Sequence, residues 1–343
     1  MARILLLLIT VWLVVSCAGK DRSDPMADWA LYKSRFVSTE GRVIDTGNGD
    51  ISHSEGQGFA MLLAEHFADQ PTFDAIWSWT QQQLQIRGDH LFAWKWTPQG
   101  DAGVVSDRNN SADGDLLIAW ALYRAARQWN QPAYQEQAAA IAGNLRELLV
   151  RPSSQGPILL PGEQGFVKEN GVIVNLSYWV FPAFQAMNEI DPAPEWQQLT
   201  QSGLNLLAMA RFGRWQLPPD WMLLSDQASL ATEFKPQFGY NAVRIPLYLV
   251  WAKLDTPENL KVFADFWGHF DGAKFTPAWT NLNDNSIDSY DASSGIEAII
   301  HMVKERVKRR PVRALPALDD QQDYYSSSLL LLTRLAITES ASE

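Results

Sequence analysis

Glu55 lies in a polar stretch that could carry acid–base chemistry. Residues 52–62 read SHSEGQGFAML and place Ser, His, Glu and Gln directly before an apolar run. A positioned carboxyl group can donate a proton in catalysis. The same glutamate would also suit the first turn of a helix, because the helix dipole favours negative charge there. Ser54 and Gln57 have the spacing of a capping box, in which each side chain hydrogen-bonds the other residue's backbone N–H.

Two glycines in this stretch fit a simple helix start poorly. Gly56 and Gly58 fall in the first turns of the expected helix, where each costs about 1 kcal/mol relative to alanine. Glycine is useful where another group must approach the backbone closely. We therefore expect something bulky to lie against this turn.

A second cluster of carboxylates opens another apolar run. Asp113 and Asp115 flank a glycine and follow two asparagines, in NNSADGDLLIAWALYRAARQW (109–129). Asp113 or Ser111 could cap a helix here. The cluster could equally form a polar site at the end of a strongly apolar helix.

Several kinds of site are disfavoured by the sequence. The net charge of −11 argues against binding to nucleic acids or anionic lipids. The five histidines lack the paired spacing typical of zinc ligands, and no glycine-rich phosphate or dinucleotide motif follows a strand. We therefore expect no metal and no cofactor.

Helical periodicity dominates the chain, and no segment is typical of a flexible linker. Apolar residues at spacings of three and four predict helices over 26–36, 55–68, 72–84, 113–129, 132–149, 177–188, 195–211, 238–252, 257–268, 293–306 and 322–336. Strand patterns are few, at 90–96, 156–161 and 171–175. These elements predict one all-α domain of paired helices around a common core, with a few short strands in its loops.

Fifteen tryptophans are an unusually large number for 343 residues. We expect four of them to belong to the core, because they fall inside amphipathic helices: Trp77, Trp120, Trp129 and Trp251. Trp94, Trp96 and Trp221 lie in or beside polar, Pro- or Gly-containing segments. An exposed indole can stack on the apolar face of a sugar ring and donate its N–H to a hydroxyl, so these three are candidate binding residues.

The N-terminus is typical of a targeting segment. Twelve apolar residues follow Arg3, which is too short for a membrane-spanning helix but fits a secretory signal. The only cysteine, Cys17, follows VVS, as in a bacterial lipoprotein processing site. The prediction is a signal segment over 1–17 with lipidation at Cys17, and one domain over 18–343. An ordinary signal peptide cut nearby is the alternative.

Taken together, the motifs resemble glycoside hydrolase family 8. SEGQGFAML looks like the family's acid-bearing motif, and SADGDLLIAWALYRAARQW resembles its second signature, with departures at Ser111 and Ala112. Further similar segments occur in family order: EGRVID, WSWTQQQL, LLPGEQGF, NLSYWVFPAF, PPDW, GYNAVRIPLYL and DYYSSSLLLL. The resemblance implies an (α/α)6 barrel and, within the family, a periplasmic endoglucanase associated with bacterial cellulose synthase.

The resemblance also implies roles for individual residues. Family members invert the anomeric carbon using one carboxylic acid and one base. Glu55 corresponds to the proton donor. Asp113 corresponds to the carboxylate that binds the sugar at the cleavage subsite, which some schemes name the nucleophile. The implied substrate-binding residues are Trp94, Trp96, Tyr178, Trp221, Tyr240 and Arg244.

The catalytic base departs from the family pattern. Cellulose-cleaving relatives carry it in a Tyr-Asp-Ala-x-Arg motif, where this chain has Asn241. An amide can orient water but cannot accept its proton. Three readings stay open: a loop carboxylate such as Asp226 or Glu233 supplies the base, catalysis is slow, or the protein binds glucan without cutting it.

Three function classes follow. The first is an inverting endo-β-1,4-glucanase that trims glucan during cellulose synthesis and export. The second is a glucan-binding protein of the export apparatus, and the third is a hydrolase of another polymer such as chitosan. The expected partners are β-1,4-glucan chains and the cellulose synthase and export complex. The expected location is the periplasm, with a lipid anchor at the outer membrane as the only membrane attachment, or secretion as the alternative.

Overall fold

Eleven α-helices form the framework of the computed structural model, which describes residues 24–100 and 102–341. The α-helices are α1 (Pro25–Phe36), α2 (Ser54–His66), α3 (Gln70–Leu84), α4 (Ala112–Trp129), α5 (Pro132–Leu149), α6 (Phe181–Ile190), α7 (Pro194–Met209), α8 (Ile245–Trp251), α9 (Pro257–Gly268), α10 (Ser294–Val307) and α11 (Tyr324–Ala341). Two short 3₁₀ turns join them, η1 (Leu176–Tyr178) and η2 (Ala242–Arg244). Within these described ranges, no helix is both long and apolar enough to cross a bilayer.

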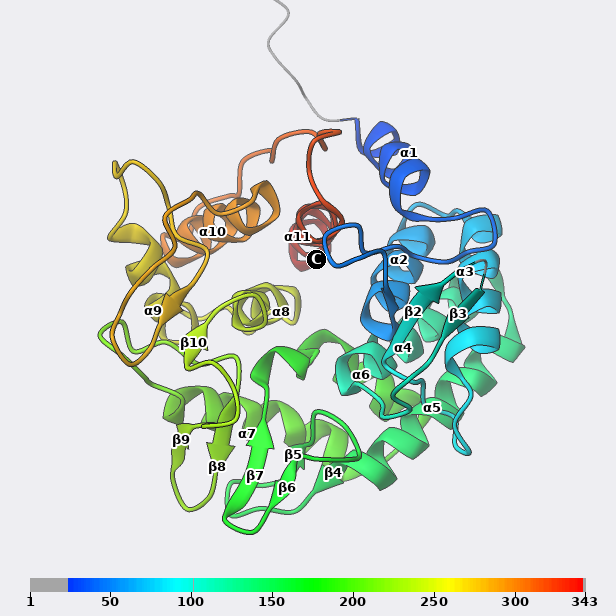
Figure 1. Cartoon of the computed structure of the whole chain (residues 1–343), viewed down its shortest axis with the longest axis horizontal. Coiled ribbons are helices and arrows are strands. Elements are labelled where there is room, and N and C mark those ends of the chain that lie inside the picture. Colours follow the sequence, from blue (N-terminus) through cyan, green and yellow to red (C-terminus); the bar gives the residue numbers. More distant parts are fainter. Residues whose placement is uncertain (1–23, 101, 342–343) are drawn as a thin grey trace, which may run out of the picture.

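The helices form two layers around a common centre (Figure 1). Helices α2, α4, α6, α8, α10 and α11 follow one another in the inner layer, and α11 returns to α2, which closes the ring. Outer helices pack on their neighbours in sequence: α3 on α2, α5 on α4, α7 on α6 and α9 on α10. This is the paired-helix barrel that the sequence predicts.

Short strands lie in the loops between helices. They are β1 (Ser52–His53), β2 (Lys95–Gln99), β3 (Ala102–Val104), β4 (Val150–Arg151), β5 (Ile158–Leu159), β6 (Val167–Lys168), β7 (Gly171–Val174), β8 (Met222–Leu224), β9 (Ala228–Leu230), β10 (Gln237–Phe238) and β11 (Thr280–Asn281). All pairings are antiparallel, in the orders β1-β2-β3, β4-β5, β6-β7-β8-β9 and β10-β11. The strand β1 leads directly into α2, so this pairing with β2 fixes the start of that helix.

Three predicted elements differ from the structure. The helix expected over 177–188 is divided into η1 and α6, which begins with a proline in its first turn. The helix expected over 238–252 begins only at η2 and α8. The strand expected over 90–96 is displaced to β2, because Ala93 donates its N–H to the Leu84 carbonyl at the end of α3 and Trp94 donates to the carbonyl of Asn109, not to a strand.

Glycines allow α2 and α4 to cross at unusually short range. A Cβ on Gly58 would lie 2.5 Å from the Leu117 Cβ, and a Cβ on Gly114 would lie 2.1 Å from the Ser54 Oγ. On Gly56, a Cβ would lie 2.5 Å from the Tyr324 hydroxyl. The bulky neighbours expected near these glycines are therefore parts of the protein itself.

The substitution Gly58→Ala tests this crossing. We expect a loss of about 1–3 kcal/mol in the free energy of unfolding, because the added methyl overpacks a buried interface. Urea denaturation measures the change. The matched control is Gly143→Ala in α5, where a Cβ meets no atom within 4 Å; there the better helix propensity should give up to about 1 kcal/mol of stabilisation. Equal responses of the two variants would contradict the proposed packing constraint.

Candidate active site

A cavity of about 440 Å³ opens where the N-terminal ends of α2, α4 and α11 approach the loop before η2. It brings together residues far apart in the sequence and contains most of the predicted site. The lining residues are Asp45, Gly47, Asn48, Ile51, His53, Ser54, Glu55, Trp94, Ser111, Asp113, Tyr178, Tyr240, Asn241, Arg244, Asp323 and Tyr325.

Glu55 is held in the first turn of α2, but the predicted capping box is wrong. His53 is the cap, and its Nδ1 accepts a hydrogen bond from the Gly56 N–H at 3.0 Å. The side chain of Gln57 turns into the core, where its Oε1 accepts from the Val43 N–H and its Nε2 donates to Thr80 Oγ1. A tertiary partner for the glutamine has replaced the local one that the spacing suggested.

Asp113 is buried in the first turn of α4, next to Glu55. The Ser111 hydroxyl and the Gly114 N–H donate to its Oδ1. Burial raises the pKa of Asp113 to about 6, although the Ser111 and Gly114 hydrogen bonds act in the opposite direction. Burial is thus the largest influence on this carboxyl group, and it favours the neutral form.

Asp115 has a different role from Asp113. Its Oδ1 accepts from the Phe92 N–H at 2.9 Å, and its Oδ2 accepts from Asn110 Nδ2 at 2.7 Å. Burial raises its pKa to about 7, and it does not line the cavity. Asp115 therefore fastens the loops beside the site and does not face a ligand.

Arg244 is the buried cation that joins the two site carboxylates. Its side chain is only 2% exposed. It forms an ion pair with Glu55, and its Nη2 lies 3.6 Å from Asp113 Oδ2. The same Nη2 donates to Ser177 Oγ and to Asn241 Oδ1. Arg244 therefore links Glu55, Asp113 and the loop of Asn241 through one buried charge.

Asn241 is positioned by an aspartate that the sequence reasoning missed. Buried Asp220 uses its Oδ1 to accept from the Gly239 and Ala242 N–H groups at 3.0 and 2.8 Å. Its Oδ2 accepts from Gln237 Nε2. Asp220 therefore shapes the loop that carries Tyr240 and Asn241. The PPDW segment contains this aspartate, but its acceptor role depends on a contact nineteen residues away.

The two loop carboxylates suggested as the base lie outside the cavity. Asp226 is exposed in the turn between β8 and β9. Glu233 is half exposed and forms an ion pair with Lys168 at 2.9 Å. Both suggestions are therefore wrong for the structure as it stands. The cavity wall instead includes Asp45 and Asp323, which the sequence reasoning did not consider.

The aromatic candidates divide into three environments. Trp94, Tyr178 and Tyr240 line the cavity, and Trp94 Nε1 donates to Asp107 Oδ2 at 2.8 Å. The assignment of Trp96 to binding is wrong, because strand alternation turns it into the core. It is 8% exposed and packs edge-on against Trp79.

Trp221 lies outside the cavity lining but next to it. Its ring stacks with Phe234 at 4.3 Å and with Phe166 at 5.8 Å between centroids, and contacts Tyr178 edge-on.

Of the four tryptophans expected in the core, Trp77, Trp120 and Trp251 are buried, and Trp129 is half-buried against the core. The helical pattern therefore assigned these four correctly.

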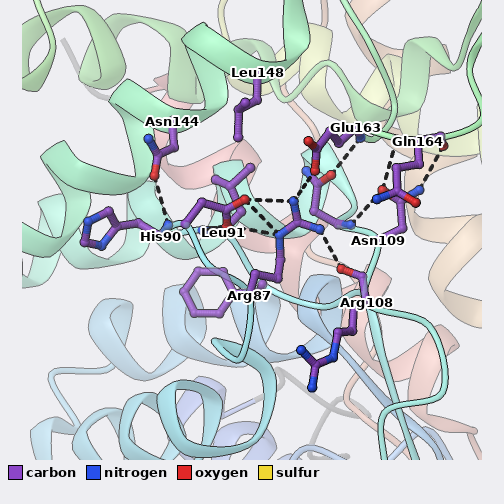
Figure 2. A network of polar contacts seen from close by, with 12 residues as sticks. Arg87, His90, Leu91, Arg108, Asn109, Asn144, Leu148, Glu163 and Gln164 are labelled. Carbon is purple, nitrogen blue, oxygen red and sulfur yellow. Dashed lines mark hydrogen bonds and ion pairs between the residues drawn. The ribbon is translucent and has the colours of Figure 1, made fainter.

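A polar network around Arg87 joins the loops that precede α4 (Figure 2). Arg87 contacts Asp89, the Arg108 carbonyl and Glu163. Asn109 exchanges two hydrogen bonds with the backbone of Gln164. Because the Asn109 carbonyl also accepts from the Trp94 N–H, the network ties three loops together at the start of α4.

The chemistry available here is that of carboxylates, amides and aromatic rings. Among residues 24–100 and 102–341, no cluster of three or more His, Cys, Asp or Glu side chains is arranged to hold a metal ion. The cavity has two adjoining carboxyl groups, a buried guanidinium and aromatic walls. This set suits proton transfer to and from a polar, ring-containing ligand.

Comparisons with known proteins agree with this chemistry. The model of glycosyl hydrolases family 8 matches residues 1–339. A probable endoglucanase of Novacetimonas hansenii is 39% identical over 325 residues, covering 92% of this chain and 93% of that protein. An endoglucanase of Cellulomonas uda is 35% identical over 294 residues, covering 85% and 81%.

Solved structures show the same similarity. The endo-β-1,4-glucanase CMCax from Acetobacter xylinum superimposes with a TM-score of 0.85 at 37% identity, covering 93% of this chain and 99% of that one. The endoglucanase Cel10 from Klebsiella pneumoniae also gives 0.85 at 37% identity, covering 91% and 99%.

Proposed function

The chain belongs to glycosyl hydrolase family 8, and from that premise we propose that it is an inverting endo-β-1,4-glucanase. The activity class is that of its endoglucanase relatives. The fold is the helical barrel of the similar glucanase structures, an (α/α)6 barrel. The observation that carries the proposal is the shared cavity of Glu55, Asp113 and Arg244, walled by Trp94 and Tyr178.

In this mechanism Glu55 donates its proton to the leaving glycosidic oxygen while water attacks the opposite face of the anomeric carbon. Asp113 lies beside Glu55 and binds the sugar at the cleavage subsite. Inversion needs no covalent intermediate, so we assign Asp113 a substrate-positioning role and not a nucleophilic one. Arg244 contacts both carboxylates and orients them before the substrate binds.

A second function is favoured by Asn241. The amide faces the cavity and can orient water, but it cannot take up a proton. A weakly active or non-hydrolytic glucan-binding protein is therefore the alternative. Release of reducing sugars from carboxymethyl cellulose by the purified protein separates the two, since a binder releases none.

We further propose that the protein trims glucan in the periplasm during cellulose synthesis and export. Motif resemblance supports this role, and the signal-like N-terminus supports the location. Cys17, the proposed lipidation site, lies outside the described residues. Ala18 follows it where an aspartate would favour retention at the inner membrane, so we propose an outer-membrane anchor. Mass spectrometry of the mature N-terminus tests this, and cleavage elsewhere with a free thiol would refute it.

Glu55→Gln should abolish hydrolysis without unfolding the protein. The amide keeps the size of the side chain but cannot serve as an acid, and a general acid contributes about 10²–10⁴ in rate. Turnover on cello-oligosaccharides and the melting temperature should be measured together. Unchanged turnover would exclude Glu55 as the proton donor, and a large loss of stability would favour a structural role.

Trp94 and Trp96 form a matched pair for testing the binding wall. Trp94→Ala should weaken cello-oligosaccharide binding by about 1 kcal/mol or somewhat more, with little change in melting temperature. Trp96→Ala should instead lower the free energy of unfolding by about 3–5 kcal/mol, since it empties a core position. Isothermal titration calorimetry and urea denaturation give the two readings. If the Trp94→Ala variant bound cello-oligosaccharides with unchanged affinity, Trp94 would not be a substrate-binding residue.

A further inference from the structure

The proposed reaction needs a group that removes a proton from the attacking water, on the side of the cavity away from Glu55. Four carboxylates line the cavity: Asp45, Glu55, Asp113 and Asp323. Glu55 is the proposed acid. Asp113 is buried beside it and faces Arg244. The choice therefore falls between Asp45 and Asp323.

Asp45 lies on the side of the cavity that carries Glu55, here called the acid side. Its Oδ1 accepts from the Gly47 N–H at 3.1 Å, and its Oδ2 lies 3.4 Å from His53 Nε2. His53 in turn caps the helix that carries Glu55, with its Nδ1 3.9 Å from Glu55 Oε2. Because Nδ1 accepts the Gly56 N–H, the imidazole proton lies on Nε2 and points toward Asp45. Oδ2 of Asp45 is thus directed at the histidine that caps the helix of Glu55, and Oδ1 is held within its own loop.

Asp323 lies against the Asn241 side. It precedes α11, and its Oδ1 accepts from the Ser326 N–H at 2.7 Å. Two residues later, the Tyr325 hydroxyl donates to the carbonyl of Tyr240, the neighbour of Asn241. The short segment from Asp323 to Tyr325 is therefore fastened to the loop where the family carries its base.

Asp323 lines the cavity beside Gly47. Oδ2 would lie 3.9 Å from a Cβ built on Gly47, which belongs to the loop before α2. Figure 1 shows this loop running beside α11. Asp323 is exposed to solvent, so the carboxylate has access to water while its other oxygen is held by the helix end.

We propose that Asp323 is the general base of this chain, acting together with Asn241. The inference rests on the proposed function. As the bond between the anomeric carbon and the leaving oxygen breaks, Glu55 gives its proton to that oxygen. The water oxygen bonds to the anomeric carbon from the opposite face, and the proton it loses passes to Asp323. Asn241 orients the water through its amide, while Asp323 supplies the basicity that the amide lacks.

Asp323→Asn tests the assignment, because asparagine keeps an acceptor for the Ser326 N–H and is itself a good helix cap. We expect kcat to fall by about 10²–10⁴, with cello-oligosaccharide affinity and melting temperature nearly unchanged. Added azide should restore turnover, since the anion attacks without needing a base, and should yield the α-glycosyl azide from the β-linked substrate. Asp320→Asn is the control, because Asp320 is exposed nearby but does not line the cavity.

Other outcomes would overturn the proposal. Full activity of Asp323→Asn would exclude Asp323 as the base. Asp45 would be the base if Asp45→Asn lost turnover that azide restores while Asp323→Asn kept full turnover. Asn241→Asp should leave activity equal or lower if Asp323 is the base; a rise of tenfold or more would show that the native chain has no working base. A wild-type protein that releases no reducing sugar would refute the proposed function itself, whereas equal activity of wild type and Asp323→Asn refutes only the base.

Discussion

The close crossing of α2 and α4 is the constraint on which the rest of the site depends. Glu55 and Asp113 each occupy the first turn of their helix, so they meet only if the two N-terminal ends meet. Gly58 and Gly114 leave no room for a side chain at this crossing. The unfavourable helix propensity of glycine is thus offset by packing that places two carboxyl groups in one cavity. Protein interiors are close-packed and have low compressibility, so this crossing leaves the two carboxyl groups little freedom to move apart.

Bringing two carboxylates together requires a compensating charge. Arg244 is nearly fully buried and contacts Glu55, Asp113, Ser177 and Asn241. A buried guanidinium without such partners would carry a large desolvation cost. The same ion pairing that makes its burial tolerable also orients the acid. This dependence explains why the short turn η2, which presents Arg244, is itself held by the hydrogen bonds of Asp220.

The sequence predicted most of the helices well because they bury an apolar stripe whose period is visible locally. Its motifs also single out Glu55, Asp113 and Arg244, which the fold brings into one cavity. Sequence reasoning failed where a partner is distant along the chain. Gln57 left its expected cap for backbone and hydroxyl groups in the core. Trp94 lines the cavity and Trp96 does not, because the strand starts later than its sequence pattern suggests. Asp323 by itself has only the spacing of a helix cap.

The asparagine at position 241 makes physical sense within this charge balance. An aspartate there would put a third carboxylate on one buried guanidinium, and every added buried charge must be desolvated. Asn241 keeps the hydrogen bond from Arg244 without adding that charge. A carboxylate at the exposed rim, as at Asp323, retains its hydration and costs far less to keep ionised. Separating the orientation of water from the removal of its proton thus lets the buried part of the site remain near charge neutrality while the basic group stays in contact with solvent.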